Sequence, residues 1–384
     1  MSQPRDFGFG ADEQMVRDQA RRFLKDSLPV ERLRNLVAHD HKQAYESKVQ
    51  PALWDEKLWR DAVALGWTGL GIPEAQGGVG LPLVALAAVA EEAGRAALPS
   101  PLLSTLCATE VLKACDTDGA RAALEAVASG TAATLATTGE AASWETASAD
   151  ITAKSSAGGF VLNGTARFVQ DARKAGFFVI SAEAETGTML VRLAADAPGL
   201  SIEADRITDL TRDQASLVLR GVEVKSADVV ATPGTADDAI REALPSIVTL
   251  IAADICGAGE WQLQTTAEYA RTRKQFDHAI GFFQAVKHPI VNMMIDIDRA
   301  KSLVYAAACA IDHEPEQADR LARMAKAAAS DAAQFVSGRS IQLHGGIGFT
   351  WECDVHIWVK RQQHSRFLWG DGTWHRARLA EAFA

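Results

Sequence analysis

The sequence lacks the features of several large classes of protein. No apolar run reaches the roughly 20 residues that cross a bilayer, and no cationic segment followed by an apolar one opens the chain. Basic residues are outnumbered, with 39 Lys and Arg against 49 Asp and Glu, so the formal net charge is -10. Such a charge repels nucleic-acid phosphates unless cations cluster on one face, and the sequence shows no such cluster. We therefore expect no membrane insertion and no nucleic-acid partner.

Cysteine is scarce, and its spacing suggests no disulfide or metal framework. The five cysteines are odd in number and contain no Cys-x-x-Cys pair. Cys256 and Cys309 lie in apolar stretches with helical spacing, as buried free thiols do. Free thiols fit a reducing compartment, so we expect a cytoplasmic protein. We assign no metal-ligating residues.

The chain contains three regions that differ in the pattern of their apolar residues. With 384 residues, of which 48% are hydrophobic and 23% charged, it is long enough for two or three subdomains with their own cores. Apolar residues three and four apart predict helices over residues 1–125 and again over 233–384. Between them, residues 126–232 carry short runs rich in Val, Ile, Phe and Thr, which predict strands. The sequence thus indicates an α+β protein with domains 1–125, 126–232 and 233–384.

Local signals refine this division. The glycine- and proline-rich stretch 69–82 cannot be the interior of a helix, and predicts an ordered loop. Asn163-Gly164 between two apolar runs predicts a hairpin turn. Residues 246–271, 289–311 and 316–343 predict three long helices, which with the C-terminal segment suggest a four-helix bundle. Small residues around Gly257 would let a neighbouring helix approach closely.

The first of two motifs runs from Arg273-Lys-Gln-Phe276 into Ile280-Gly-Phe-Phe-Gln284. A guanidinium can bind a pyrophosphate through two hydrogen bonds, and the neighbouring Phe276 offers a flat apolar face to a ring. The structural alternative is that Arg273 ends a helix and interacts only with the helix dipole. Taken alone, this short motif favours the structural alternative, because short motifs match by chance.

The second motif is Gln342-Leu-His-Gly345-Gly346-Ile-Gly348, placed after a long helix. Three glycines let the backbone pass close to a ligand, where side chains would clash. The alternative is a helix C-cap followed by a loose turn, but a cap needs one glycine only. His344 beside them is interpreted as a packed or backbone-bonded histidine.

In their order and separation, the two motifs resemble those of the acyl-CoA dehydrogenase family. The resemblance implies an N-terminal helical domain, a middle β-barrel domain and a C-terminal four-helix bundle, with FAD as the cofactor. It implies that one subunit supplies Arg273, Phe276 and Gln284, and that its partner supplies Gln342, Gly345 and Gly346. Such a divided site requires at least a dimer, homomeric or heteromeric, and a dimer of dimers fits the family.

The family's chemistry is removal of an α-proton by a carboxylate while the β-hydride passes to the flavin. Trp369-Gly-Asp371-Gly-Thr373 resembles the family's Glu-Gly-Thr turn, which makes Asp371 the candidate base. Asp371 is one methylene shorter than Glu and lies two residues further along than usual. Some relatives take their base from the helix before Cys256, where this chain has Ile247, which accepts no proton. Two flavin-contacting stretches of the middle domain are also altered, at residues 137–140 and 168–172.

These departures leave three hypotheses open. The first is FAD-dependent α,β-dehydrogenation of an acyl-CoA thioester, by this chain as a subunit of a homo- or heteromeric enzyme, with electron-transferring flavoprotein as acceptor. The second is a non-catalytic partner subunit that completes or stabilises the flavin site of a related chain. The third is a flavin oxidase or monooxygenase of the same fold. By analogy, the departures resemble those of enzymes acting on bulky or branched acyl groups such as steroid side chains.

Overall fold

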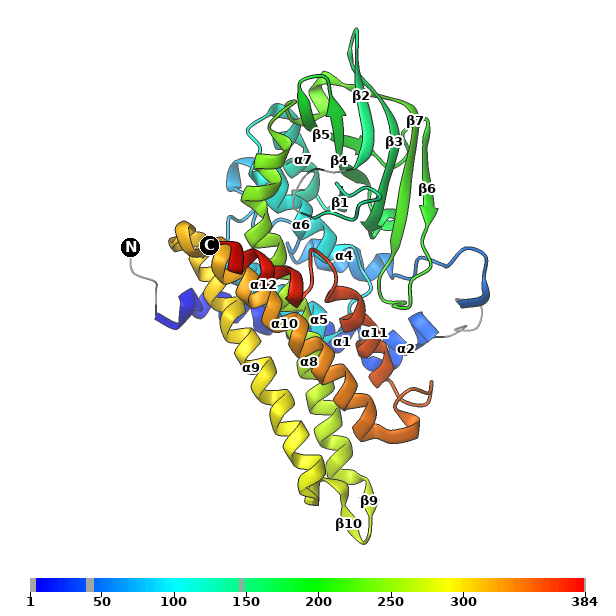
Figure 1. The fold of residues 1–384 in the computed structure, drawn as a ribbon, viewed down its shortest axis with the longest axis vertical. Helices are drawn as coiled ribbons and strands as arrows, with labels where there is room; N and C mark the ends of the chain where they lie inside the picture. The colour runs from blue at the N-terminus through cyan, green and yellow to red at the C-terminus, as the bar shows by residue number, and fades with distance from the viewer. Residues whose placement is uncertain (1–4, 39–44, 145–146, 148, 383–384) are drawn as a thin grey trace.

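A computed structural model describes residues 5–38, 45–144, 147 and 149–382. Figure 1 shows a β-sheet at one end of the molecule and long helices extending from the other, with the N-terminal helices between them. Within the described residues, no helix combines the length and the apolar character that a membrane span needs. The order of elements is helices, then strands, then helices, as the sequence texture predicts.

The N-terminal region is built from short helices with clear start signals. Asp55 begins the helix of residues 56–64 by accepting the N–H groups of Lys57 and Leu58, and Thr117 begins that of residues 118–128 by accepting the N–H of Ala120. Between residues 69 and 82 the chain forms turns and one short 3-10 helix, so the loop prediction is confirmed. The helices are α1 (Ala11–Ser27), α2 (Val30–Ala38), α4 (Glu56–Ala64), α5 (Leu83–Arg95), α6 (Leu102–Lys113) and α7 (Asp118–Ala128).

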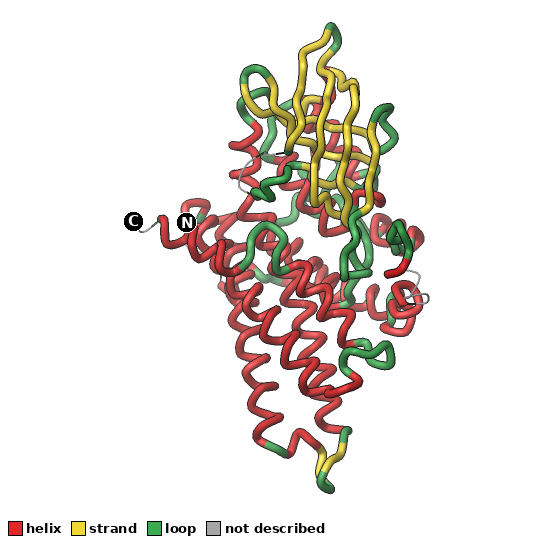
Figure 2. Tube along the Cα trace, turned by 45° about the vertical axis from the view of Figure 1, so that its right-hand side comes forward, coloured by secondary structure: helices red, strands yellow, loops and turns green. Residues whose placement is uncertain are grey.

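The middle region forms one eight-stranded sheet, seen in yellow in Figure 2. Its hydrogen-bonded path runs β6-β7-β3-β2-β4-β5-β8, and β1 pairs in parallel with β4. Alternating apolar side chains build a core of their own against this sheet. The strands are β1 (Ala133–Ala136), β2 (Asp150–Ser156), β3 (Gly159–Gln170), β4 (Phe177–Ala184), β5 (Gly187–Ala194), β6 (Leu200–Ala204), β7 (Gln214–Lys225) and β8 (Val229–Ala231).

The predicted hairpin turn at Asn163-Gly164 is wrong. Both residues lie inside the long strand β3, at a register shift in its pairing with β7. The Asn163 side chain accepts the N–H of Gly221 at 2.7 Å, and Gly164 has a φ of +136°, with Asp150 O 2.0 Å from where a Cβ would lie. The pair therefore serves a β-bulge, which favours the same residue types as a tight turn.

The C-terminal region has three long helices side by side and two short ones packed on them (Figures 1 and 2). Helices α5 and α8 cross in backbone contact, because a Cβ on Gly257 would lie 1.8 Å from Glu91 O and one on Gly94 would lie 2.0 Å from Asp254 O. This confirms the close approach predicted around Gly257. The helices are α8 (Ala236–Thr272), α9 (Gln284–His313), α10 (Pro315–His344), α11 (Val355–Ser365) and α12 (Gly372–Glu381).

Candidate functional site

The first motif forms the tip of the long-helix bundle. Arg273 ends α8, and the next residues form a small hairpin of β9 (Lys274–Gln275) and β10 (His278–Ala279), at the bottom of Figure 1. Phe276 and Asp277 make the turn with φ values of +53° and +62°. Phe276 is 84% exposed, which is rare for so apolar a side chain. Gln284 begins α9 nearby and is also exposed.

The second motif lies at the same end of the bundle. Helix α10 ends at His344, whose ring stacks on Tyr269 of α8 with centroids 4.5 Å apart. Gly345 follows with a φ of +65°, and a Cβ on Gly345 or Gly346 would meet nothing within 4 Å. Gln342 and both glycines are exposed. His344 Nδ1 lies 2.8 Å from Ser340 O, in line with the structural interpretation of this histidine.

All six cofactor candidates therefore lie at one solvent-facing end of a single chain. A ligand held there would have little surface around it unless a second chain covered it. Apolar side chains in and beside the motifs are exposed too, among them Phe282 (60%) and Phe349 (71%). Exposed apolar groups in such a patch are typical of an interface between subunits.

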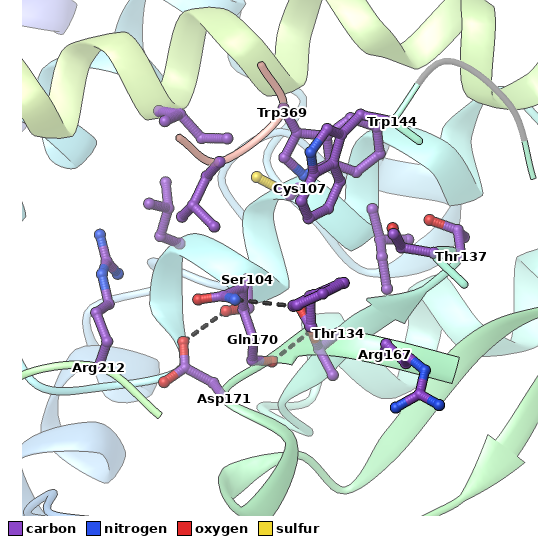
Figure 3. A pocket seen from close by; sticks show the side chains of 16 residues that line it. Ser104, Cys107, Thr134, Thr137, Trp144, Arg167, Gln170, Asp171, Arg212 and Trp369 are labelled. Carbon is purple, nitrogen blue, oxygen red and sulfur yellow. Dashed lines mark hydrogen bonds between the residues drawn. The ribbon is translucent and has the colours of Figure 1, made fainter. Parts of the chain in front are cut away.

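A second, inner pocket lies where the sheet meets the helices (Figure 3). Helix α6 contributes Ser104 and Cys107, α8 contributes Ile251, and the turn before α12 contributes Leu368 and Trp369. From the sheet side come Thr134, Leu135, Thr137, Thr138, Arg167, Phe168, Gln170 and Asp171. Both altered middle-domain stretches thus meet the C-terminal turn here, although the sequence alone did not place them together.

The inner pocket is almost filled by its own side chains. Its cavity volume is about 40 Å³, whereas ordinary ligand sites measure about 300 Å³ or more. Trp144 and Trp369 lie against each other at one wall, with ring centroids 5.4 Å apart and planes at 37° (Figure 3). On the other side of Trp144, Phe168 and Leu368 an open groove of about 680 Å³ begins. The groove has room for a cofactor-sized group, whereas the inner pocket does not.

Asp171 is the one carboxylate among the described residues that line the inner pocket. Its side chain is fully buried, and both oxygens are engaged: Ser104 Oγ donates to one at 2.5 Å, and Lys174 Nζ to the other at 2.9 Å. Asp171 also has a φ of +50°, which is strained for a residue with a Cβ. The two bonds fix the orientation of this carboxylate within the chain.

A buried charge cluster lies behind this pocket. Asp254 of α8 accepts from Arg212 Nη2 at 2.8 Å and from Arg361 Nη2 at 2.5 Å, and all three side chains are at most 3% exposed. Burial alone would raise the pKa of Asp254, but the two guanidinium groups hold it below its ordinary value. Asp254 therefore stays ionised, and joins α8 to α11 and to the loop before β7.

Asp371, the candidate base, lies outside the inner pocket lining. It is half-buried at the start of α12, where its Oδ1 accepts the N–H of Trp374 at 2.9 Å. Trp369, two residues earlier, occupies the pocket wall instead. Ile247 of α8, at the alternative base position, is fully buried. The catalytic role of Asp371 thus stays a prediction.

Sequence reasoning missed Lys326, which is fully buried in α10. Its Nζ donates to Gly370 O at 2.7 Å, to Arg366 O at 2.9 Å and to Ser330 Oγ at 3.1 Å. The only signal was a lone lysine on the apolar face of an alanine-rich helix. That signal predicts burial but not the partners, because two of the three acceptors lie forty or more residues further along.

Comparison with known proteins agrees with this geometry. The family model for the C-terminal domain of acyl-CoA dehydrogenases matches residues 239–384, and that for the N-terminal domain matches residues 10–131. Acyl-CoA dehydrogenase IpdE2 of Mycobacterium tuberculosis is 34% identical over 360 residues, covering 92% of this chain and 94% of its own. The chain belongs to the acyl-CoA dehydrogenase family. It is therefore an oxidoreductase of the kind that acts on acyl-CoA, and its cofactor is FAD.

Solved structures of acyl-CoA dehydrogenases share the fold over nearly the whole chain. The ChsE4-ChsE5 complex from Mycobacterium tuberculosis contains a chain with a TM-score of 0.86 and 26% identity, covering 98% of both chains. A variant of the steroid acyl-CoA dehydrogenase Tcur3481-Tcur3483 has a TM-score of 0.83 and 28% identity, covering 97% of this chain and 98% of its own. The recognition of the family and of its three-part fold from sequence is thus confirmed.

The residues at the bundle tip fit the pyrophosphate part of FAD, whereas those of the inner pocket leave little space for a ligand. At the bundle tip, the open space over Gly345 and Gly346 and the exposed Arg273 suit a dinucleotide backbone and its pyrophosphate. At the inner pocket, the Trp144–Trp369 pair leaves no room for an acyl group, and Asp171, the one carboxylate among the described lining residues, is already bonded to Ser104 and Lys174. The tip of this acyl-CoA dehydrogenase is thus open to solvent, whereas its inner pocket is almost filled by its own side chains.

Proposed function

We propose that this chain is one subunit of a FAD-dependent acyl-CoA dehydrogenase made of two unlike chains, which carries out α,β-dehydrogenation of a CoA thioester. The observation that supports this most strongly is the contrast between an open cofactor-binding tip and a closed inner pocket in the same chain. A self-sufficient enzyme needs both to be open. A chain with only the first can serve a reaction centre that its partner completes.

In this proposal the exposed tip holds the cofactor across the subunit interface. Arg273 pairs with the pyrophosphate, Phe276 and Gln284 contact the adenine end, and Gln342, Gly345 and Gly346 let the backbone approach from the other chain. FAD when bound supplies the hydride acceptor. The apolar side chains beside the tip become buried when the two chains meet, which also excludes water from the cofactor.

A second candidate is a non-catalytic partner that only stabilises the flavin site of a related chain. The engaged carboxylate favours it, since Asp171 is bonded to both Ser104 and Lys174. The alternative to this second candidate is that Asp371 acts as the catalytic base. Its carboxylate would then have to leave the N–H of Trp374 and turn towards a substrate. The two differ in whether Asp371 affects the rate of the assembled enzyme.

The substrate and partners follow by similarity. The steroid acyl-CoA dehydrogenase among the similar structures supports a bulky acyl group, such as a steroid side chain, as the substrate class. A heteromeric assembly, either a pair or a dimer of dimers, is supported by the complex of ChsE4 with ChsE5. Electron-transferring flavoprotein is the proposed acceptor. Five cysteines without a disulfide fit the proposed cytoplasmic location.

The test is to co-express this chain with the other acyl-CoA dehydrogenase chains of its source, one at a time, and to mix each complex anaerobically with a steroid-side-chain CoA thioester. The proposal expects one pairing to yield a flavin-containing complex whose absorbance near 450 nm bleaches. The matched control is the same complex carrying Arg273→Ala. Bleaching by this chain purified alone would contradict the proposal.

A further inference from the structure

The turn that carries Trp369 into the inner pocket is strained. Trp369 has a φ of +57° and Gly370 a φ of +91°, so two successive residues adopt left-handed backbone. For a bulky aromatic residue this conformation is a genuine outlier, which persists only when the surroundings hold it. A Cβ on Gly370 would lie 2.3 Å from the ring of Trp374, so the turn has no space to relax in that direction.

Three carbonyl oxygens of this turn are hydrogen-bonded by the side chains of Lys326 and His375. Lys326 Nζ donates to Arg366 O at 2.9 Å and to Gly370 O at 2.7 Å, which lie on either side of Trp369. His375 Nε2 lies 2.9 Å from Trp369 O. A carbonyl can only accept, so this nitrogen carries the proton. Burial, together with the nearby Lys326, lowers the pKa of His375 to about 3, which keeps the ring neutral.

A fully buried ammonium is costly unless its donors are satisfied. Lys326 has no carboxylate at hydrogen-bond distance among its described partners, which are two carbonyls and the hydroxyl of Ser330. Asp371 attracts it through space, while Arg366 repels it. An apolar residue would fill this helix position at lower cost, so the cation is best explained by what its three bonds hold in place.

We propose that Lys326 and His375 form a latch that fixes the 366–370 turn and thereby sets the position of Trp369 against Trp144 in the wall of the inner pocket. Both are positioning residues, because they act through Trp369. The latch rests on the proposed function in one respect only, which is that the inner pocket is taken to be the place where a ligand binds. Without the hydrogen bonds of Lys326 and His375, Trp369 would lose its strained backbone conformation and move away from Trp144. This movement would open the pocket.

The test uses the optical coupling of the two indoles. Rings with centroids 5.4 Å apart give an exciton signal in circular dichroism, which is isolated by subtracting the spectrum of Trp369→Phe from that of the wild-type chain. The same subtraction is made in a Lys326→Met background, with Lys326→Met/Trp369→Phe as the reference. We expect Lys326→Met to reduce the difference signal at least about threefold, since a shifted ring loses the coupling.

A matched control separates positioning from general destabilisation. Val336→Ala lies on the same helix and removes buried apolar volume away from the turn. It should leave the difference signal unchanged. If Lys326→Met does not fold, His375→Leu removes the bond to Trp369 O and is read in the same way. An undiminished difference signal in the folded latch variants would overturn the proposal.

This outcome is independent of the dehydrogenase proposal. The optical measurement needs neither flavin nor acyl-CoA, so it can fail while the complex still bleaches, and it can succeed while no complex forms. A functional readout then links the two. In the assembled enzyme, the effects of Lys326→Met and Trp369→Ala on acyl-CoA affinity should be non-additive by about threefold or more, whereas independent sites would give additive effects.

Discussion

The tip of the helical bundle and the inner pocket carry opposite kinds of structure. At the tip, Phe276 is 84% exposed and the glycines at 345 and 346 face open space. At the pocket, Trp369 is 6% exposed and every carboxylate oxygen of Asp171 is bonded. The comparison teaches that one chain combines a tip that is open to solvent with an inner pocket that its own side chains almost fill, beside an open groove of about 680 Å³.

The pocket side should be the more rigid of the two, and Asp254→Asn tests this with the largest expected effect. The substitution removes the ion-pair partner that the buried Arg212 and Arg361 share, so the unfolding free energy should fall by about 3–5 kcal/mol. Urea denaturation measures it. Asp238→Asn, which affects only an exposed pair with Arg241, should change stability by no more than about 0.5 kcal/mol. Equal losses of unfolding free energy in the two variants would show that the buried charge cluster does not stabilise the pocket side.

The tip should matter for the cofactor and not for stability. Arg273→Ala removes a charged partner of the pyrophosphate, so the FAD affinity of the assembled enzyme should fall about tenfold to a hundredfold. Flavin absorbance after gel filtration measures the loss. Arg271→Ala, two residues earlier and equally exposed, should leave the flavin content as it is. Identical flavin loss in the two variants would mean that Arg273 has no specific role.

The latch should give the pocket side a pH dependence that the tip lacks. Burial lowers the pKa of Lys326 from its ordinary 10.5 to about 7, with Asp371 opposing and Arg366 adding to the effect. At pH values between about 7 and 10.5, Lys326 is protonated in the unfolded chain but largely neutral in the folded one. Stability due to Lys326 therefore rises with pH, by up to about 1.4 kcal/mol per unit above pH 7.

Denaturation at pH 7, 8 and 9 tests this rise. The unfolding free energy of the wild-type chain should increase relative to that of Lys326→Met across this range. Groups common to both chains cancel in the difference. Parallel curves for the two proteins would show that Lys326 keeps its ordinary pKa in the folded state.

Asp371→Asn should have the smallest effect. Asn caps a helix about as well as Asp, so α12 should keep its start and stability should change by no more than about 0.5 kcal/mol. If the carboxylate serves only as a cap, the desaturation rate of the assembled complex should stay within about twofold. A loss of about a hundredfold or more, as expected for removal of a general base, would establish Asp371 as the base.

Periodic signals predicted the arrangement of the fold, and local motifs identified residues that the structure places at its exposed tip. Helical spacing found α8, α9 and α10, because each helix packs an apolar face over much of its length. The residues at the tip could be identified because each motif lies within a few consecutive residues. The Asn163-Gly164 prediction failed because a bulge and a hairpin turn favour the same pair, and only the pairing of β3 with β7 distinguishes them.

The inner pocket could not be predicted from the sequence, for a different physical reason. It is formed by contacts between residues far apart in the chain, such as Trp144 with Trp369 and Lys326 with Gly370. None of these pairs has a fixed spacing, so no local pattern identifies them. The sequence did show that residues 137–140 and 168–172 depart from the family. It did not show that both stretches line one cavity with Trp369.

The most direct test of the account is the flavin-to-protein ratio and visible spectrum of this chain purified alone, before and after anaerobic addition of a CoA thioester. The account predicts little or no bound flavin, and no bleaching of any that is retained, because the chain holds only part of a shared site. A full flavin complement that bleaches on addition of the thioester would show that the chain is a self-sufficient dehydrogenase and would contradict the account.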